Sequence, residues 1–119
     1  MPAQQKVQSP ADAGVNEVRL IGRLSQAPEE RVLPSGDVLV TFRVVVPRPA
    51  PSGRSTVDAL ECAAWSSRAR RSVATWKPDD VVEVIGAVRR RFFRTAGGAA
   101  SRVEVEVSRG KVIRRAGSG

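Results

Sequence analysis

The chain has 119 residues, a mass of 12.8 kDa and a net charge of +8, with no histidine, no tyrosine and one cysteine, Cys62. This length suits one domain that buries roughly two-thirds of its unfolded surface. The missing histidines exclude catalytic triads and the common zinc sites, and one cysteine excludes an internal disulfide. No apolar stretch reaches the length of a membrane span, and residues 1–14 lack a signal-peptide pattern. Composition therefore favours a cytosolic binding protein without catalytic residues, metal or cofactor.

The positive charge is concentrated near the C-terminus. Residues 89–119 have a net charge of +7, whereas residues 1–88 have a net charge of +1. Seventeen of the 20 basic residues are arginine, whose planar side chain donates paired hydrogen bonds to phosphate and stacks on bases. This asymmetry indicates a polyanionic partner, with a membrane surface as the second choice.

The chain divides into a disordered arm over residues 1–14, a folded domain over residues 15–114 and a flexible end over residues 115–119. Valine dominates the apolar residues of the domain, which favours β-strands. Polar and apolar residues alternate in three successive segments, separated by a turn signal and a loop rich in proline and glycine. These expected strands cover residues 17–24, 38–46 and 56–65, with the turn at residues 34–37 and the loop at residues 47–55.

The period changes after the third expected strand. Ser66 or Ser67 can cap a short helix in which Ala69, Val73 and Trp76 form one apolar stripe. Two further strands are expected after the helix, followed by a possible edge segment. They cover residues 81–94 and 102–108, the loop between them residues 95–100, and the edge residues 111–114. This order predicts an all-β fold, a five-stranded Greek-key OB-fold barrel with one short helix between strands 3 and 4. A β-sandwich is the alternative.

The candidate binding site is a basic and aromatic cluster at the end of the fourth expected strand. Period two places Arg89, Arg91 and Phe93 on one face, where the ring can stack a base and the arginines can reach phosphates. The same register turns Arg43 and Trp65 away from the core. The alternative is that the arginines are ordinary edge-strand charges, that Phe93 packs under the loop at residues 95–100, and that Trp65 is an interface or core residue. Two further arginines are candidates. Arg23 points outward from the first expected strand, and Arg94 lies at the end of the fourth.

Ordered short motifs resemble the bacterial single-stranded DNA-binding protein family. They begin with Val15-Asn16-Glu17-Val18 and Leu20-Ile21-Gly22-Arg23-Leu24, continue through Pro28-Glu29 and Pro34-Ser35-Gly36, and include residues 40–45 and 82–91. The resemblance covers about residues 15–114. The high arginine and alanine content is similar to an actinobacterial background.

The resemblance implies that aromatic residues stack bases while nearby basic residues hold the backbone. By position it implies these roles for Phe93, Trp65, Arg89 and Arg91. Two stacking tryptophans of the family are missing, near residues 47–50 and at Ala59. The family's long tail with an acidic, apolar tip is also missing, so we expect no tail-mediated recruitment of partners. The resemblance further implies a homo-oligomer, a dimer of dimers, in the cytoplasm at the nucleoid.

The expected function is sequence-tolerant binding of single-stranded DNA in replication, recombination and repair. A protein-interaction module, such as a primosome accessory, is the first alternative. Binding of RNA or of duplex by charge is the second. An enzyme is the least favoured class because no residue set offers an activated nucleophile or convergent carboxylates.

Overall fold

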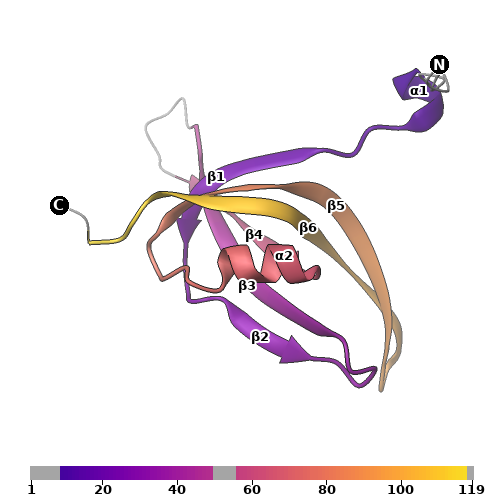
Figure 1. The fold of residues 1–119 in the computed structure, drawn as a ribbon. Coiled ribbons are helices and arrows are strands. Elements are labelled where there is room, and N and C mark those ends of the chain that lie inside the picture. Colours follow the sequence, from indigo (N-terminus) through magenta and orange to yellow (C-terminus); the bar gives the residue numbers. More distant parts are fainter. Residues whose placement is uncertain (1–8, 50–55, 118–119) are drawn as a thin grey trace, which may run out of the picture.

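The computed structural model describes residues 9–49 and 56–117, and within these it contains six strands and two helices (Figure 1). Residues 1–8 of the expected N-terminal arm, residues 50–55 of the expected loop and residues 118–119 lie outside the described residues. The elements in chain order are α1 Pro10–Ala13, β1 Val18–Leu24, β2 Glu29–Val32, β3 Val38–Arg48, β4 Thr56–Ala64, α2 Ser67–Val73, β5 Val81–Thr95 and β6 Gly98–Arg114.

Five of the strands close into a barrel. The strand order is β1-β5-β6-β4-β3-β2, and an additional pairing of β1 with β3 closes the barrel and leaves β2 as an edge strand beside β3. All pairings are antiparallel except the short parallel contact of β4 with β6, where Cys62 faces Val105. With α2 between β4 and β5, this confirms the predicted OB-fold barrel and excludes the sandwich.

The barrel core comes from the inward positions of the valine-rich strands. Leu24, Val44, Val82 and Val84 are fully buried, as the alternation in the sequence predicts. The helix α2 begins where the Ser66 hydroxyl accepts a hydrogen bond from the Ala69 amide, which is the predicted cap.

The apolar stripe of α2 continues into the core, where Ala69, Val73 and Trp76 are all buried. The Trp76 ring meets Phe42 edge to face, with centroids 5.3 Å apart. The helical stripe and the barrel interior therefore form one core, as the sequence predicted for these three residues.

Two glycines allow strands to approach closely. A Cβ atom on Gly22 would lie 2.3 Å from the Val45 carbonyl oxygen, where β1 crosses from β5 to β3. A Cβ atom on Gly86 would lie 2.0 Å from the Glu106 carbonyl oxygen, at the register shift between β5 and β6. Both distances are far below contact range, so the barrel closes only with glycine at these positions.

Two expectations about the connections are wrong. Residues 29–32, for which no strand was predicted, form the short strand β2, which pairs with the first half of β3. All four β2 side chains are exposed, so the strand carries no apolar alternation to reveal it. Residues 95–100, interpreted as a flexible loop, contain only a tight turn, because β5 runs to Thr95 and β6 begins at Gly98.

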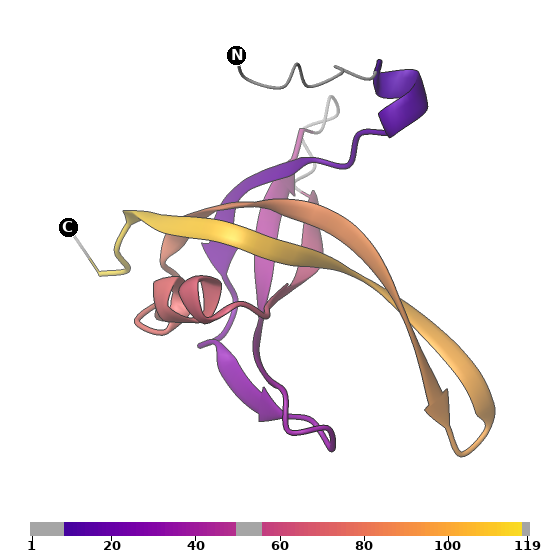
Figure 2. The same ribbon diagram turned by 45° about the vertical axis from the view of Figure 1, so that its right-hand side comes forward.

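The β5–β6 pair continues well beyond the barrel as a twisted arm (Figures 1 and 2). The side chain of Asn16 marks where β5 leaves its neighbour β1. Its amide accepts from the Val88 backbone N–H at 2.9 Å and donates to the Val88 carbonyl at 2.7 Å.

No helix among the described residues has the length and apolar character needed to cross a membrane.

Candidate nucleic-acid interface

A cleft of about 400 Å³ lies between the β2–β3 hairpin and the β5–β6 arm. In Figure 2 the two hairpins extend below the barrel and diverge from each other. Trp65, directly after β4, belongs to the cleft wall between them. The lining residues are Arg31, Leu33 and Leu39 from the first hairpin, Arg91, Phe92, Phe93 and Arg102 from the arm, and Trp65.

Each of two aromatic rings in this cleft has a guanidinium group beside it. The guanidinium carbon of Arg91 lies 4.6 Å from the Trp65 ring centroid, and that of Arg102 lies 5.9 Å from the Phe93 centroid. The Phe93 side chain remains 43% exposed. The cleft therefore contains both of the predicted groups, an exposed aromatic ring and adjacent guanidinium groups.

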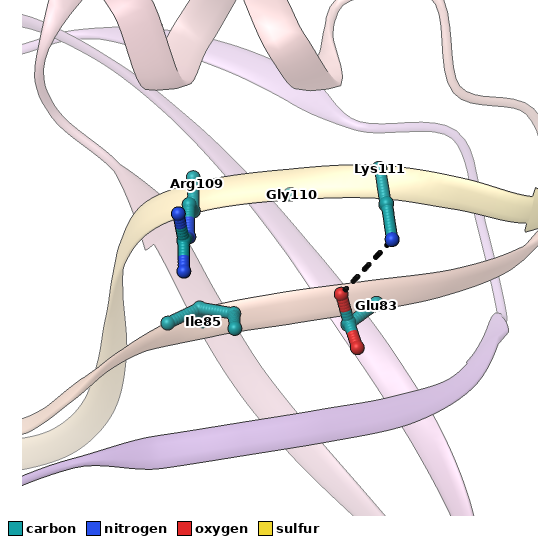
Figure 3. A pocket seen from close by; sticks show the side chains of 5 residues that line it. All are labelled: Glu83, Ile85, Arg109, Gly110 and Lys111. Carbon is teal, nitrogen blue, oxygen red and sulfur yellow. Dashed lines mark ion pairs between the residues drawn. The ribbon is translucent and has the colours of Figure 1, made fainter.

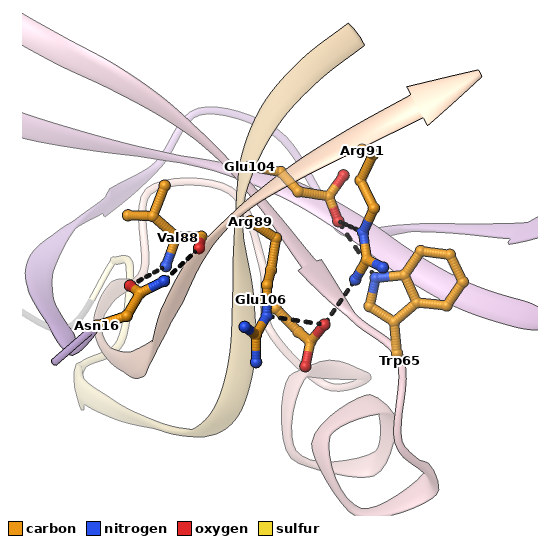
Figure 4. Close-up of polar contacts among 7 residues, drawn as sticks. All are labelled: Asn16, Trp65, Val88, Arg89, Arg91, Glu104 and Glu106. Carbon is orange, nitrogen blue, oxygen red and sulfur yellow. Dashed lines mark hydrogen bonds and ion pairs between the residues drawn. The ribbon is translucent and has the colours of Figure 1, made fainter. Parts of the chain in front are cut away.

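One carboxylate organises these side chains. Glu104 is only 4% exposed, and its Oε2 accepts hydrogen bonds from the Trp65 indole Nε1 at 3.2 Å and from the Arg91 Nε at 3.4 Å (Figure 4). Its other oxygen lies 3.7 Å from an Arg102 nitrogen. A buried carboxylate needs such partners. Glu104 thus ties Trp65, Arg91 and Arg102 into one polar cluster.

A second carboxylate partly neutralises the same face. Glu106 accepts from Arg91 at 2.5 Å and lies 3.7 Å from the Arg89 Nε (Figure 4). Arg89 and Arg91 are therefore side by side on one face, as period two predicts, but both already have an acidic neighbour. Any phosphate that contacts these arginines must compete with Glu106.

The cleft continues past Arg31 toward Arg43. Arg31 also lines the two adjoining hollows, together with Thr41 and Glu61, and Arg43 lines the farther of them. Arg43 donates to a Glu61 carboxylate oxygen from Nε at 2.8 Å and from a terminal nitrogen at 2.5 Å. The outward face of β3 and β4 thus connects Arg43 with the aromatic end of the cleft.

The other sequence candidates lie outside the cleft. Arg23 pairs with Asp79 at 3.5 Å, beside the start of β5. Arg89 lies next to the cleft but does not line it. Arg94 belongs to the opposite face of the arm, because its cross-strand partner is Ala99, one position from the Phe93–Ala100 pair. The structure therefore brings Phe93, Arg91 and Trp65 together in the cleft, places Arg89 beside it and Arg43 in an adjoining hollow, and separates Arg23 and Arg94 from them.

Sequence reasoning missed several cleft residues. Arg31 was not considered because β2 was not expected. Arg102 carried a usable signal, since it alternates with Glu104 and Glu106 on the same face of its strand. Leu33 and Leu39, from the β2–β3 hairpin, were also missed. Phe92 belongs to the predicted cluster but was not chosen, because period two places it on the opposite face from Phe93.

A second depression, of about 270 Å³, lies on the β5–β6 pair nearer the other end of β6 (Figure 3). Its carboxylate, Glu83, is already engaged by Arg19 at 2.7 Å and by Lys111 at 3.8 Å. The hydrogen bond from Arg19 is the main cause that lowers the pKa of Glu83 below its ordinary value. The depression contains no aromatic ring. Unlike the cleft, the depression therefore offers a nucleic-acid strand no ring on which a base could stack.

The described residues contain no group of three His, Cys, Asp or Glu side chains placed to hold a metal ion. The single cysteine is unreactive. Burial of Cys62, together with the nearby Glu61 and Glu104, raises the pKa of its thiol to about 12. A thiol with this pKa is protonated at neutral pH and is a poor nucleophile.

Comparisons with known proteins agree with this geometry. Residues 15–113 match the model of the single-strand binding protein family. Curated relatives include single-stranded DNA-binding protein 3 of Listeria innocua, 32% identical over 86 residues that make up 71% of this chain and 54% of the relative. Single-stranded DNA-binding protein A of Bacillus subtilis is 30% identical over 71% of this chain and 50% of its own length.

A third relative, the single-stranded DNA-binding protein of Oceanobacillus iheyensis, is 30% identical over 71% of this chain and 53% of its own length. The chain thus spans about half the length of the curated relatives it matches. The matching family is one of binding proteins and not of enzymes, which confirms the prediction that the chain is not an enzyme. The chain belongs to the single-strand binding protein family.

Proposed function

We propose that this protein binds single-stranded DNA with little sequence preference, and that the strand lies in the cleft between the β2–β3 hairpin and the β5–β6 arm. The observation that carries the proposal is the pair of aromatic–guanidinium contacts, Trp65 with Arg91 and Phe93 with Arg102, in one cleft. Every base has a π face, so stacking of this kind tolerates any sequence.

The two rings differ in how they receive a base. Phe93 offers an exposed ring for direct stacking. Trp65 is half-buried, and its ring is covered by Arg91 on one side. We therefore propose that a base stacks on the Arg91 guanidinium, which the Trp65 ring supports from behind. Arg31, Arg43 and Arg102 then follow the phosphates along the cleft.

The wider role rests on family membership. We propose that residues 15–114 form the binding domain, that the protein acts as a homo-oligomer built as a dimer of dimers, and that it supports replication, recombination and repair. Its place of action is then the cytoplasm, at the nucleoid. The arginine- and alanine-rich composition supports an actinobacterial-like source.

A titration with end-labelled oligo-dT, read by fluorescence anisotropy, tests the proposal. We expect saturable binding that weakens as salt rises, with a logarithmic slope of about −0.7 for each phosphate neutralised. A duplex of equal length should bind more weakly. Phe93→Ala should cost about 1–3 kcal/mol of binding free energy, whereas Ile113→Ala, an exposed apolar residue at the far end of β6, should cost nothing.

Three results would overturn the proposal. Absence of saturable binding to oligo-dT would leave a protein-interaction module as the better reading. Equal or tighter binding of a duplex, or of an RNA strand, would indicate recognition by charge or by the ribose. Equal binding by Phe93→Ala and by the parent protein would move the stacking site away from the cleft.

A further inference from the structure

Two carboxylates of β6 lie beside the arginines of the candidate interface, and their surroundings differ. Glu104 and Glu106 occupy alternate positions, so they share one face of the strand. The Glu104 side chain is 3% exposed, whereas that of Glu106 is 35% exposed. A count of charges makes both residues unfavourable to a polyanion such as DNA. Their exposure and their contacts, however, give them different effects on the arginines.

Glu104 holds side chains from three different elements. Its Oε2 accepts from the indole Nε1 of Trp65, which follows β4, at 3.2 Å and from the Nε of Arg91, on β5, at 3.4 Å (Figure 4). Its Oε1 lies 3.7 Å from a guanidinium nitrogen of Arg102, on β6 itself. A carboxylate offers acceptors only, and each of the three partner groups is a donor. Both oxygens of this buried group are therefore engaged.

The three partners of Glu104 take part in the aromatic–guanidinium contacts of the cleft. The Arg91 guanidinium lies 4.6 Å from the Trp65 ring centroid, and that of Arg102 lies 5.9 Å from the Phe93 centroid. All four of these residues line the cleft. Glu104 does not line it and borders an adjoining hollow of about 70 Å³. A strand in the cleft therefore contacts the partners of Glu104 and not the carboxylate itself.

Loss of Glu104 would free these side chains without moving the backbone that carries them. Among residues 9–49 and 56–117, the other carboxylate bonded to Arg91 is Glu106, which would then hold the guanidinium alone. The Trp65 carbonyl would still accept from Arg70, on α2, so the indole ring is released while its backbone stays in place. Side chains that are free before binding must be ordered when the ligand arrives, which lowers affinity.

We propose that Glu104 is a positioning residue of the cleft, whose carboxylate raises the affinity for single-stranded DNA by holding Trp65, Arg91 and Arg102 in their binding arrangement. The inference rests on the proposed function and deepens it. Repulsion between Glu104 and the phosphates is weak, because two guanidinium groups beside the carboxylate balance its charge. An acidic residue thus favours the binding of a polyanion.

Glu104→Gln in the full chain tests this role, with Glu106→Gln as the matched control from the same face of β6. Each variant removes one negative charge and keeps the size of the side chain. Charge alone predicts that both variants bind labelled oligo-dT more tightly than the parent protein does. We expect Glu104→Gln to bind at least about fivefold more weakly, because freed side chains must be ordered again on binding. We expect Glu106→Gln to bind more tightly.

Glu104→Asp separates the position of the carboxylate from its charge. Aspartate keeps the charge but is shorter by one methylene group, so it cannot reach all three donors at their present distances. We expect this variant to lose affinity for oligo-dT as well, although the net charge of the protein is unchanged. Circular dichroism at the titration temperature shows which variants are folded. If Glu104→Gln is not folded, Glu104→Asp provides the same test.

A double-mutant cycle distinguishes positioning from a general effect on the fold. In Arg91→Lys the stack on Trp65 is already lost, so adding Glu104→Gln should cost a smaller factor in affinity than it costs in the parent protein. The indole N–H signals of the two tryptophans in an NMR spectrum give a second readout. The Trp65 signal should move in Glu104→Gln, whereas that of Trp76, buried in the core, should not.

Three results would overturn the inference while leaving the proposed function intact. They are binding by Glu104→Gln that equals or exceeds that of the parent protein, binding by Glu104→Asp that equals it, and independent effects of the two substitutions in the cycle. Failure of the parent protein itself to bind oligo-dT would instead refute the proposed function, so the two failures can be told apart.

Discussion

The guanidinium carbon of Arg91 lies 4.6 Å from the centre of the Trp65 ring, and both side chains bond to the same oxygen of Glu104. This shared carboxylate fixes the relative position of the two side chains before any ligand arrives. An arginine that is already held loses little rotamer freedom on binding, which reduces the entropic cost of association. The contact therefore prepares a flat cationic surface in the wall of the cleft.

Arg91→Lys tests whether the flat shape of this group matters. Lysine keeps the charge but cannot stack on Trp65 or bond to Glu104 and Glu106 at once. We expect affinity for oligo-dT to fall by about 1–2 kcal/mol, with the salt slope nearly unchanged. The measurement is an anisotropy titration at several salt concentrations.

Arg89→Lys is the matched control, because Arg89 occupies the same face of β5 but neither lines the cleft nor contacts a ring. It should bind as the parent protein does. Equal losses in the two lysine variants would show that the Trp65–Arg91 stack contributes nothing specific.

The barrel was predictable because its information lies in local alternation. The inward residues of β1 and β5, such as Leu24, Val82 and Val84, follow period two without interruption. The cap at Ser66 and the stripe of α2 were equally local. β2 was not predictable, since its exposed residues have no apolar partner and only the pairing with β3 makes them a strand.

The site was predictable only in part. Period two placed Phe93 and Arg91 together, and those two residues do meet in the cleft. Nothing local indicated that Glu104 lies beneath Trp65, a contact that spans 39 residues of sequence, or that Arg31 faces the arm across the cleft. The direction of a long strand beyond the end of a barrel depends on register and twist, which single-sequence patterns do not fix.

Glu106 is expected to weaken DNA binding in the parent protein, because it pairs with Arg91 at 2.5 Å and lies 3.7 Å from Arg89. Glu106→Gln keeps the size of the side chain and removes the competing charge. We expect tighter binding at low salt and a salt slope that grows by about 0.7 if one more phosphate is neutralised. The titration is repeated at several salt concentrations.

Glu17→Gln serves as the control, since Glu17 is exposed and lies outside the cleft but carries the same charge. Its binding curve should gain much less than that of Glu106→Gln. Weaker binding by Glu106→Gln would mean that Glu106 instead holds Arg91 in its binding position, and the competition argument would be wrong.

Gly86 is expected to be essential for barrel closure. Its missing side chain lets the Glu106 carbonyl approach to within 2.0 Å of the place that a Cβ would occupy. Gly86→Ala should therefore lower the Tm by about 10 °C or more, because strand backbone must shift to admit the methyl group. Gly97→Ala, in the turn of the arm, has only a side-chain atom 3.9 Å away and should leave the Tm nearly unchanged. Thermal unfolding followed by circular dichroism gives both values, and similar Tm values for the two variants would refute the argument.

Asp80 joins the end of β6 to the segment before β5. Its side chain is 1% exposed, and its two oxygens accept from the Ala116 amide at 2.8 Å, the Lys77 amide at 2.9 Å and Arg115 at 3.0 Å. The Ala116 hydrogen bond, with help from Lys77 and Arg115, lowers the pKa of Asp80 below its ordinary value of 3.8, although burial acts in the opposite direction.

This lowered pKa predicts a specific acid dependence of stability. A carboxylate with a lowered folded-state pKa stabilises the fold fully above its unfolded pKa, near 3.8, and this contribution is lost as pH falls through the folded value. Asp80→Asn should therefore lower the free energy of unfolding by about 1–3 kcal/mol at pH 7, the range for hydrogen bonds to a charged group. The difference from the parent protein should shrink below pH 4, as the parent protein's own carboxylate becomes protonated. Urea unfolding of both proteins at pH 7, 5 and 3 measures it, with Asp12→Asn, an exposed aspartate of α1, as the control. A difference that stays constant over this range would show that Asp80 acts through shape and neutral hydrogen bonds, and not through its charge.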